Sequence, residues 1–467
     1  MIWVATILFC FVLVEVALRL PFGNALSALT RSTQRASRTM ASRRISDHWK
    51  EKAIGAYAGR TFRASGTLAV LILGLAAVAA AFAWVLGAIL GRDLFAFLLT
   101  LPGLLLSAFV ASLYAWMRMR RAPSEGYSAT DRLLHRLALG RPAIAEMSFD
   151  MDQARGGLDI AGVTAARHVF VAGLARAGTT VLMRRFHASG AFRSLTYRDM
   201  PFVLAPRLWA SVSSASRKAT AVTERAHGDS LTVSADSPEA LDEVFWRVFE
   251  GESYIQPDRL VPHRVGTDLV SKFRRYVAAV LGGTGASRYL SKNNNNILRL
   301  GTIRAAFPNA LILIPFRNPA DHAGSLLSQH VRFQGLHRDD PFAQSYMTWL
   351  AHHEFGSDHR PFVMAGDRPA GSPLSVEYWL TIWCDVYEWL LETAPEDAVF
   401  VSYEALCDDP NVWNRLANAA SVPVETISDG GFKRSRSTYE LAEDDVLRAR
   451  AGDILSRLLQ RSERDGD

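Results

Sequence analysis

The chain has 467 residues, of which 49% are hydrophobic, and a formal net charge of +6. This length allows two or three domains, and the hydrophobic content is enough for a packed core together with membrane-embedded segments. The three cysteines, Cys10, Cys384 and Cys407, lack metal-ligand spacing and exclude a disulfide framework, in agreement with a reducing compartment.

Two long uncharged runs lie in the N-terminal part of the chain. One extends from Ala64 to Gly91 and the other from Leu94 to Met117, with a short polar turn between them. As a helix, each run is long enough to cross the roughly 30 Å of hydrocarbon in a bilayer. We therefore predict a transmembrane hairpin over residues 66–117.

Residues 1–20 are also apolar, but they include Glu15 and Arg19 at a spacing of four residues. This pattern predicts a helix that either spans the membrane or lies in its interface. A cleaved signal peptide is disfavoured, because no basic region precedes the apolar residues and no small-residue cleavage site follows them.

The charge of the flanking segments predicts the orientation. Residues 31–63 carry nine Lys or Arg residues against only Asp47 and Glu51. By the positive-inside rule, this segment and everything after the hairpin should face the cytoplasm. Anionic lipid head groups then account for much of the excess positive charge, so membrane lipids are the expected partner and nucleic acid is not.

The remainder of the chain has the pattern of an α/β domain. Residues 122–165 are rich in Gly and Pro and are predicted to be a linker, which leaves residues 166–467 as the globular domain. Short apolar runs typical of parallel strands alternate with helical patterns. The predicted strands lie within 168–173, 310–316 and 397–406, and the predicted helices within 178–190, 237–250 and 375–393. We predict a P-loop-type parallel sheet flanked by helices and preceded by an N-terminal transmembrane α-helical region.

The first predicted strand runs into a loop that has the chemistry of a phosphate site. Residues 173–180 read Gly-Leu-Ala-Arg-Ala-Gly-Thr-Thr, so Thr179 stands where P-loop ATPases carry lysine. Backbone N–H groups and the helix dipole can hold an anion without that lysine. Arg176 becomes the fixed cation, and its permanent charge suits a reaction in which negative charge builds on a leaving phosphate.

This loop resembles the 5′-phosphosulfate loop of the sulfotransferases, in particular the GxxRSGTT branch of carbohydrate, tyrosylprotein and bacterial enzymes. The chain departs from that pattern at Ala177, where serine is usual. A second family element is an arginine at a strand end with a serine eight residues later, and Arg317 and Ser325 match it. The resemblance covers about residues 165–440. It implies the donor 3′-phosphoadenosine 5′-phosphosulfate (PAPS), with no metal required. The donor-binding residues that it implies are Gly173, Arg176, Ala177, Gly178, Thr179, Thr180, Arg317 and Ser325.

Three further segments fit the resemblance in part. The loop at 430–440 offers Lys433 and Arg434, which could close over the phosphates of the donor or form a basic surface loop. Lys292 lies in a segment similar to the family's lysine-bearing segment, so it is either a sulfate contact or a surface lysine. Tyr403 and Glu404, in residues 401–410, are expected to support a sheet end.

Sulfuryl transfer resembles phosphoryl transfer, so the protein must position the reactants, neutralise charge and remove one proton. The resemblance implies a carboxylate base about twenty residues beyond the loop cation, and Asp199 lies twenty-three residues after Arg176. Its alternative role is a cap near Pro201. His227 is the competing base or an acceptor contact. The aromatic and histidine-rich residues 346–362 could stack against a sugar or form a packed insertion.

Together these features predict a membrane-anchored, multi-pass sulfotransferase with its catalytic domain in the cytoplasm. It would move sulfate from PAPS to a hydroxyl-bearing acceptor, most plausibly a glycan or glycolipid, with Arg176, Asp199 and His227 as the catalytic candidates. The alternatives are an ATP-dependent P-loop phosphotransferase and a non-enzymatic nucleotide-binding membrane protein.

Overall fold

The computed structural model divides the chain into two compact units, Met1–Asp131 and Arg132–Asp467, each considered by itself. The structure describes residues 2–20, 47–91, 93–120, 129–213, 223–224, 232–233, 238–423, 432, 434 and 445–464.

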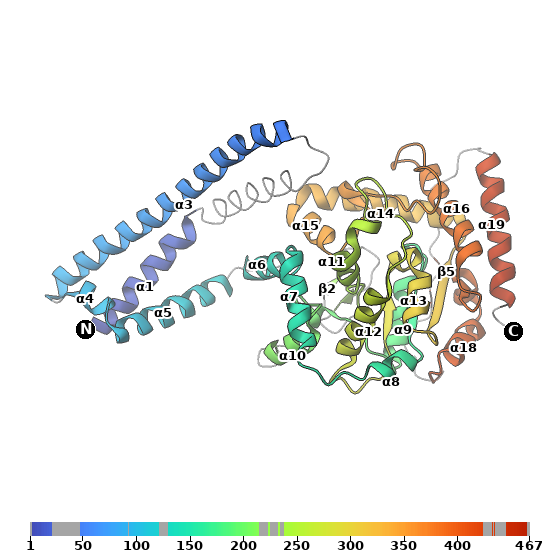
Figure 1. Ribbon diagram of the computed structural model, residues 1–467, viewed down its shortest axis with the longest axis horizontal. Helices are drawn as coiled ribbons and strands as arrows, with labels where there is room; N and C mark the ends of the chain where they lie inside the picture. Colours follow the sequence, from blue (N-terminus) through green and yellow to red (C-terminus); the bar gives the residue numbers. More distant parts are fainter. Residues whose placement is uncertain are drawn as a thin grey trace. The chain divides into compact units, whose positions relative to one another are not determined.

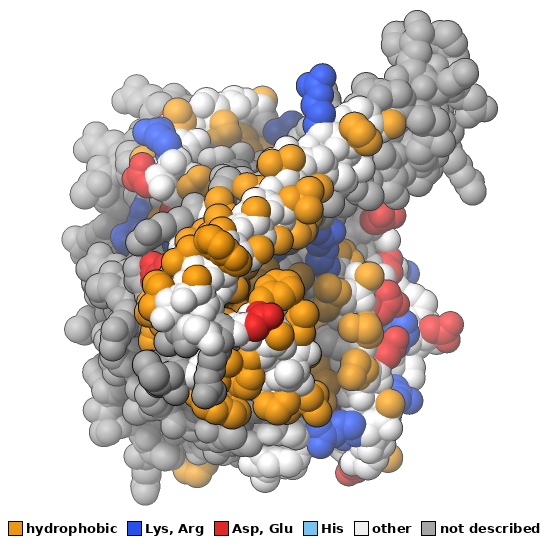
Figure 2. Space-filling view, turned by 90° about the vertical axis from the view of Figure 1, so that its left-hand side faces the viewer, with side chains coloured by type: hydrophobic (Ala, Val, Ile, Leu, Met, Phe, Trp, Pro, Cys, Tyr) orange, Lys and Arg blue, Asp and Glu red, His pale blue; other side chains and the backbone are white. Residues whose placement is uncertain are grey.

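The first unit consists of helices that pack through apolar side chains. They are α1 (Ile2–Arg19), α3 (Asp47–Leu90), α4 (Leu94–Leu98) and α5 (Leu101–Arg120). Phe9, Cys10 and Ala83 form a small buried cluster between α1 and α3. The Tyr114 hydroxyl on α5 donates to Glu15 Oε1 on α1 over 3.1 Å, which gives this carboxylate a partner among apolar residues. Hydrophobic side chains also cover much of the outer surface of these helices (Figure 2).

The two arms of the predicted hairpin differ in length. Within α3, residues Thr61–Ile89 are long and apolar enough to cross a membrane, by length and composition. The second run is not one continuous helix, because α4 ends at Leu98 and α5 begins at Leu101, with Pro102 in its first turn. Its apolar part, Leu101–Tyr114, is shorter, as is Ala5–Ala17 in α1.

The prediction of a linker over residues 122–165 is wrong for most of that range. Residues that were assigned to it form three helices, α6 (Ala129–Ala138), α7 (Pro142–Gln153) and α8 (Ile160–Ala165), of which α7 and α8 lie wholly in the second unit and α6 begins at the end of the first. Leu139, Phe149 and Val163 are buried in the main core. Pro142 marks a helix start and not a linker, since it begins α7, and the Asp159 carboxylate caps α8.

The second unit is built on the predicted parallel sheet. Four strands lie in the order β4-β1-β5-β6, and all neighbouring pairs are parallel. They are β1 (Val169–Val171), β4 (Leu290–Lys292), β5 (Leu311–Phe316) and β6 (Val399–Ser402). Three strands were predicted. β4 was not, because it is short and carries Ser291 and Lys292, which break the apolar pattern.

Alternate residues of the strands contribute to two hydrophobic cores, one on each face of the sheet. Phe170, Ile312 and Ile314 belong to the larger core, whereas Val171 and Leu313 belong to the smaller one. Residues of α9 (Thr179–Ala188) and α18 (Pro410–Ala419) line the smaller core. Residues of α11 (Glu243–Tyr254), α12 (Thr267–Leu281), α14 (Pro319–Asp339), α16 (Val376–Thr393) and α19 (Asp445–Arg464) line the larger one (Figure 1).

The remaining elements are short. The helices are α10 (Pro206–Ser213), α13 (Leu300–Ala306), α15 (Pro341–Trp349) and α17 (Tyr403–Asp408), the 3₁₀ turns are η1 (Tyr197–Asp199), η3 (Asn294–Leu298) and η4 (Gly356–Asp358), and β2 (Thr223–Glu224) pairs antiparallel with β3 (Thr232–Val233).

A fully buried ion pair joins α11 to the segment after β4. Arg299 donates to both carboxylate oxygens of Glu243 over 2.7 and 2.8 Å, and neither side chain is exposed to solvent. Tyr254 and Asn293 also donate to Glu243, while Arg299 lies over the rings of Trp246 and Tyr254. Every oxygen of the carboxylate is therefore satisfied inside the larger core.

Arg299→Met should lower the free energy of unfolding by about 3–5 kcal/mol, because it leaves the Glu243 charge buried without its main partner. Urea denaturation of the full chain measures this change. The double variant Glu243→Leu with Arg299→Met should lose less stability than the single one, since no buried charge remains. Equal losses in the two variants would contradict the interpretation.

Candidate functional site

The loop between β1 and α9 has the shape that an anion site requires. β1 ends at Val171 and α9 begins at Thr179, with Gly178 as the residue that precedes the helix, at φ 85°. A β-carbon on Gly178 would lie 2.2 Å from Tyr403 Cδ2, so both the backbone conformation and the close approach require glycine. The N–H groups of the first turn of α9 therefore lie at this loop, and the helix dipole adds partial positive charge there.

Arg176 and Arg317 meet at the loop. Arg176 has a left-handed backbone (φ 70°), uncommon for a residue with a side chain. Its carbonyl oxygen accepts a hydrogen bond of 3.1 Å from Arg317 Nη1, at the end of β5. Its own Nε donates to Ser325 Oγ on α14 over 3.1 Å. The loop, the strand end and the following helix therefore share one site, as the sequence predicted.

The residues that follow β6 hold Arg317 in place. Glu404 Oε1 lies 4.0 Å from Arg317 Nε and accepts a hydrogen bond of 3.1 Å from the Asn318 N–H. The Arg317 guanidinium lies 5.6 Å from the centre of the Tyr403 ring. Tyr403 and Glu404 thus have the supporting role that was predicted for them.

His322 supports the loop through a hydrogen bond, and sequence reasoning missed it. It is completely buried on α14, and its Nε2 lies 2.8 Å from the carbonyl oxygen of Ala175. Burial and the nearby Arg317 charge lower the pKa of His322 to about 3, so the ring is neutral and Nε2–H is the donor. Only its position five residues after Arg317, one helical turn into α14, could have indicated this contact.

The other loop residues are placed unequally. Thr179 and Ala177 are buried, and the Ala177 N–H donates to the Leu174 carbonyl over 3.3 Å. Thr180 is half-buried in the first turn of α9. A β-carbon on Gly173 would lie 3.0 Å from the Pro315 carbonyl, so this glycine lets β1 and β5 approach each other.

Lys292 is not a surface lysine. It ends β4 beside Val171 of β1 and is only 6% exposed. The next residue, Asn293, donates its backbone N–H to the Val171 carbonyl over 3.2 Å. Lys292 therefore lies at the same edge of the sheet as the loop.

The predicted base Asp199 is engaged in a structural motif. Arg193 Nη2 lies 2.6 and 2.7 Å from its two carboxylate oxygens, and Thr196 donates its backbone N–H to Oδ2 over 2.7 Å. Together with the Thr196 hydroxyl this forms a capping box on η1. These donors occupy both oxygens, so the geometry favours the capping role over proton removal.

Some predicted residues lie outside the part of the chain that the structure describes. These are His227 and Lys433. Arg434 is described and forms an ion pair with Asp408 at the end of α17. Phe432 packs against Tyr403 and Trp413, which places this stretch next to the ring that covers Gly178.

Of the two alternatives for residues 346–362, the packing of this segment favours a packed insertion. Leu350, Phe355 and Phe362 contribute to the larger core. Among the described residues, no group of three or more His, Cys, Asp or Glu side chains is arranged to hold a metal ion.

Comparison with known proteins gives the family. Residues 168–361, which include the loop, Lys292, Arg317 and Ser325, match the profile of the sulfotransferase family. The part of the chain that carries the site therefore has the sequence pattern of the sulfotransferase family, and this match supports a sulfotransferase enzyme. Comparison with curated proteins gives no match.

Several solved structures are similar to this chain. A sulfotransferase from Mycobacterium tuberculosis has 14% identity and a TM-score of 0.37 over 71% of this chain and 83% of that one. A sulfotransferase from Mycobacterium avium has 14% identity and a TM-score of 0.36 over 74% and 81%. A sulfotransferase from Alicyclobacillus acidocaldarius has 15% identity and a TM-score of 0.31 over 64% and 96%.

Gly178→Ala should reduce sulfotransferase activity at least about tenfold, because the new methyl group displaces Tyr403 and the start of α9. Gly190→Ala is a matched control, since Gly190 also has a positive φ (71°) but no atom within 4 Å of an added β-carbon. The control should lose stability and keep its activity. Parallel assays of activity and thermal unfolding separate the two effects, and equal activity losses would contradict the steric argument.

Proposed function

We propose that this protein transfers a sulfuryl group from PAPS to a hydroxyl group of a glycan or glycolipid at a membrane. The observation that carries the donor assignment is the meeting of Arg176, Arg317 and Ser325 at the N-terminus of α9. Two guanidinium groups and a helix N-terminus at one site favour a ligand with several anionic groups.

The residues of the site fit the two charged ends of such a donor. The loop N–H groups and the hydroxyls of Thr179 and Thr180 would hold the 5′-phosphosulfate, and Arg317 with Ser325 would hold the 3′-phosphate. Lys433 and Arg434 would add charge from the C-terminal segment. When bound, PAPS supplies the sulfuryl group together with its phosphate leaving group.

The protein's own groups then supply charge and position. Arg176, fixed through its carbonyl by Arg317 and through Nε by Ser325, presents a permanent positive charge beside the 5′-phosphate position. Lys292, held at the adjacent strand end, adds a second cation towards the sulfuryl group. Neither contribution depends on a metal ion. An ATP-dependent phosphotransferase is disfavoured, because Thr179 replaces the lysine that would hold the β- and γ-phosphates.

The membrane part of the proposal rests on the apolar helix Thr61–Ile89 and on the unit that contains it. We infer that α3 spans the bilayer with α5 and α1 packed beside it, and that the basic segment 31–63 keeps the catalytic domain on the cytoplasmic side. Attachment at the bilayer would raise the local concentration of a lipid-linked acceptor. This is the reason for proposing a glycolipid or lipid-linked glycan.

Arg317→Ala should weaken binding of 3′-phosphoadenosine 5′-phosphate about 10- to 150-fold, the equivalent of losing one charged hydrogen bond to phosphate. Isothermal titration of the full chain measures the affinity, and transfer of ³⁵S from PAPS to membrane lipid and glycan extracts measures the activity. The matched control is Arg288→Ala, because Arg288 donates to backbone carbonyls at the opposite, amino edge of the sheet. Unchanged nucleotide affinity in the Arg317 variant would contradict the proposed donor site.

The full chain should stay with the membrane pellet after an alkaline carbonate wash. Leu73→Arg in the middle of the α3 span should release a large part of it, because a central arginine costs about 2.5–3.5 kcal/mol on insertion. Val446→Arg, at an exposed apolar position on α19, is the control and should change nothing. Release of the wild-type chain by the wash would refute the membrane span.

A further inference from the structure

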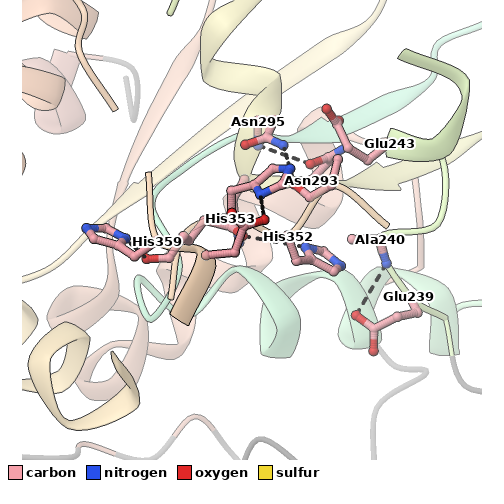
Figure 3. Close-up of polar contacts among 12 residues, drawn as sticks. Glu239, Ala240, Glu243, Asn293, Asn295, His352, His353 and His359 are labelled. Carbon is pink, nitrogen blue, oxygen red and sulfur yellow. Dashed lines mark hydrogen bonds and ion pairs between the residues drawn. The ribbon is translucent and has the colours of Figure 1, made fainter. Parts of the chain in front are cut away.

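Because Asp199 is held by its cap, the reaction still requires a group that accepts the acceptor's proton. The histidines between α15 and α16 are candidates, and Figure 3 shows His352, His353 and His359 together with Asn293 and Asn295. In this view the rings of His352 and His359 point in opposite directions. Each of the three rings has a different environment.

The asparagine turn after Lys292 ties the histidine segment to the active edge of the sheet. Asn294 Nδ2 donates to Glu354 Oε1 over 2.8 Å, and Asn295 Nδ2 donates to the Ala351 carbonyl over 3.3 Å. These two bonds lie on either side of His352 in the sequence. The position of this histidine is therefore fixed relative to the strand end that carries Lys292.

The backbone at this point is strained. Ala351 has a φ of 56°, in the left-handed region that residues with a β-carbon rarely occupy. Such a conformation costs on the order of 1–3 kcal/mol and persists only where the surroundings enforce it, commonly at functional sites. Here Asn295 and the burial of Ala351 enforce it, and the residue that it orients is His352.

Glu354 faces the His352 ring. Glu354 Oε2 lies 3.6 Å from His352 Nδ1. Burial raises the pKa of Glu354, but the interactions with His352 and Asn294 outweigh burial and lower the pKa to about 2, so the carboxylate stays charged. Glu354 also lines a pocket with Leu174 and Ala175, which are residues of the phosphate loop. The carboxylate thus lies on the Nδ1 side of the ring, so Nε2 is the nitrogen that remains for an acceptor hydroxyl.

The two neighbouring histidines, His353 and His359, already have partners. His353 is buried and paired with Asp358 at 2.8 Å. His359 lies 2.7 Å from the Glu354 carbonyl through Nδ1 and 2.9 Å from the Tyr378 hydroxyl through Nε2, so both of its nitrogens are used. His352 faces Glu354 through Nδ1, and 14% of its side chain is exposed to solvent.

We propose that His352 is the general base of the transfer reaction, and that Glu354 and Asn294 are positioning residues that orient it. This proposal rests on the proposed function. The bond between sulfur and the bridging phosphate oxygen breaks as the acceptor oxygen bonds to sulfur. The hydroxyl proton passes to His352 Nε2, where Glu354 stabilises the resulting cation, and the nucleotide leaves with the bridging oxygen and its electron pair.

His352→Gln in the full chain should lower kcat at least about 100-fold, the usual contribution of a general base, while the affinity for 3′-phosphoadenosine 5′-phosphate stays within about twofold. The acid limb of the kcat–pH profile should disappear in this variant. In Glu354→Gln the limb should persist while kcat falls, because the ring loses the carboxylate that orients it. Added imidazole should restore part of the activity of His352→Ala, which a purely structural role would not allow.

His353→Gln is the matched control, since it removes an adjacent histidine and an ion pair without touching the proposed base. It should lower the melting temperature and leave kcat within about threefold. Asp199→Asn should likewise lose stability and retain its pH profile. A wild-type acid limb in His352→Gln, or loss of that limb in Asp199→Asn, would overturn the proposal while leaving the sulfotransferase reaction intact. If the wild-type chain neither binds the nucleotide nor transfers label from PAPS, the proposed function and this inference both fail.

Discussion

The hydrogen bond from Arg317 to the carbonyl of Arg176 is the contact on which the site depends. It joins residues 141 positions apart, and it exists because β1 and β5 are adjacent parallel strands whose carboxyl ends meet at one edge. A guanidinium group at the end of one strand can thereby hold the loop that follows the other. Gly173, which lets the two strands approach, and His322, which holds Ala175, act on the same loop.

The outer strand β4 organises the other half of the site. The four asparagines that follow it all donate hydrogen bonds from their side chains. Asn293 donates to Asp242 and Glu243 at the start of α11, Asn294 to Glu354, Asn295 to Ala351 and Asn296 to Ser291. Asp242, which accepts hydrogen bonds from Tyr289 and Ser291, belongs to the same network, and burial raises its pKa to about 6. A polar network inside the larger core is stable only when its members are satisfied. Lys292 and the histidine segment are therefore held by the same set of contacts as the core.

The N-terminal unit shows how one polar pair is accommodated among apolar helices. Glu15 on α1 would be costly in hydrocarbon without a partner, and the Tyr114 hydroxyl on α5 provides one. This bond, with the packing of Phe9 and Cys10, makes α1 part of a helical unit and not an isolated segment. In the proposed membrane setting, such a pair would fix how α1 and α5 face each other.

The sequence by itself determined the elements whose signals are local. Continuous apolar runs specified β1, β5 and β6, and the spacing of Gly173, Arg176 and Gly178 between a strand and a helix predicted an anion loop. Arg317 and Ser325 were found because their spacing matches an element of the sulfotransferase pattern. Only the tertiary structure decided the contacts that join distant segments. Residues 129–165 are helices that pack on the core because other helices offer them apolar partners, as Phe245 and Phe249 of α11 do for Phe149. Asp199 is a cap because Arg193 and Thr196 donate hydrogen bonds to its carboxylate. His352 gained its place through asparagines more than fifty residues away, since hydrogen-bond partners depend on where the folded chain brings side chains and not on their order in the sequence.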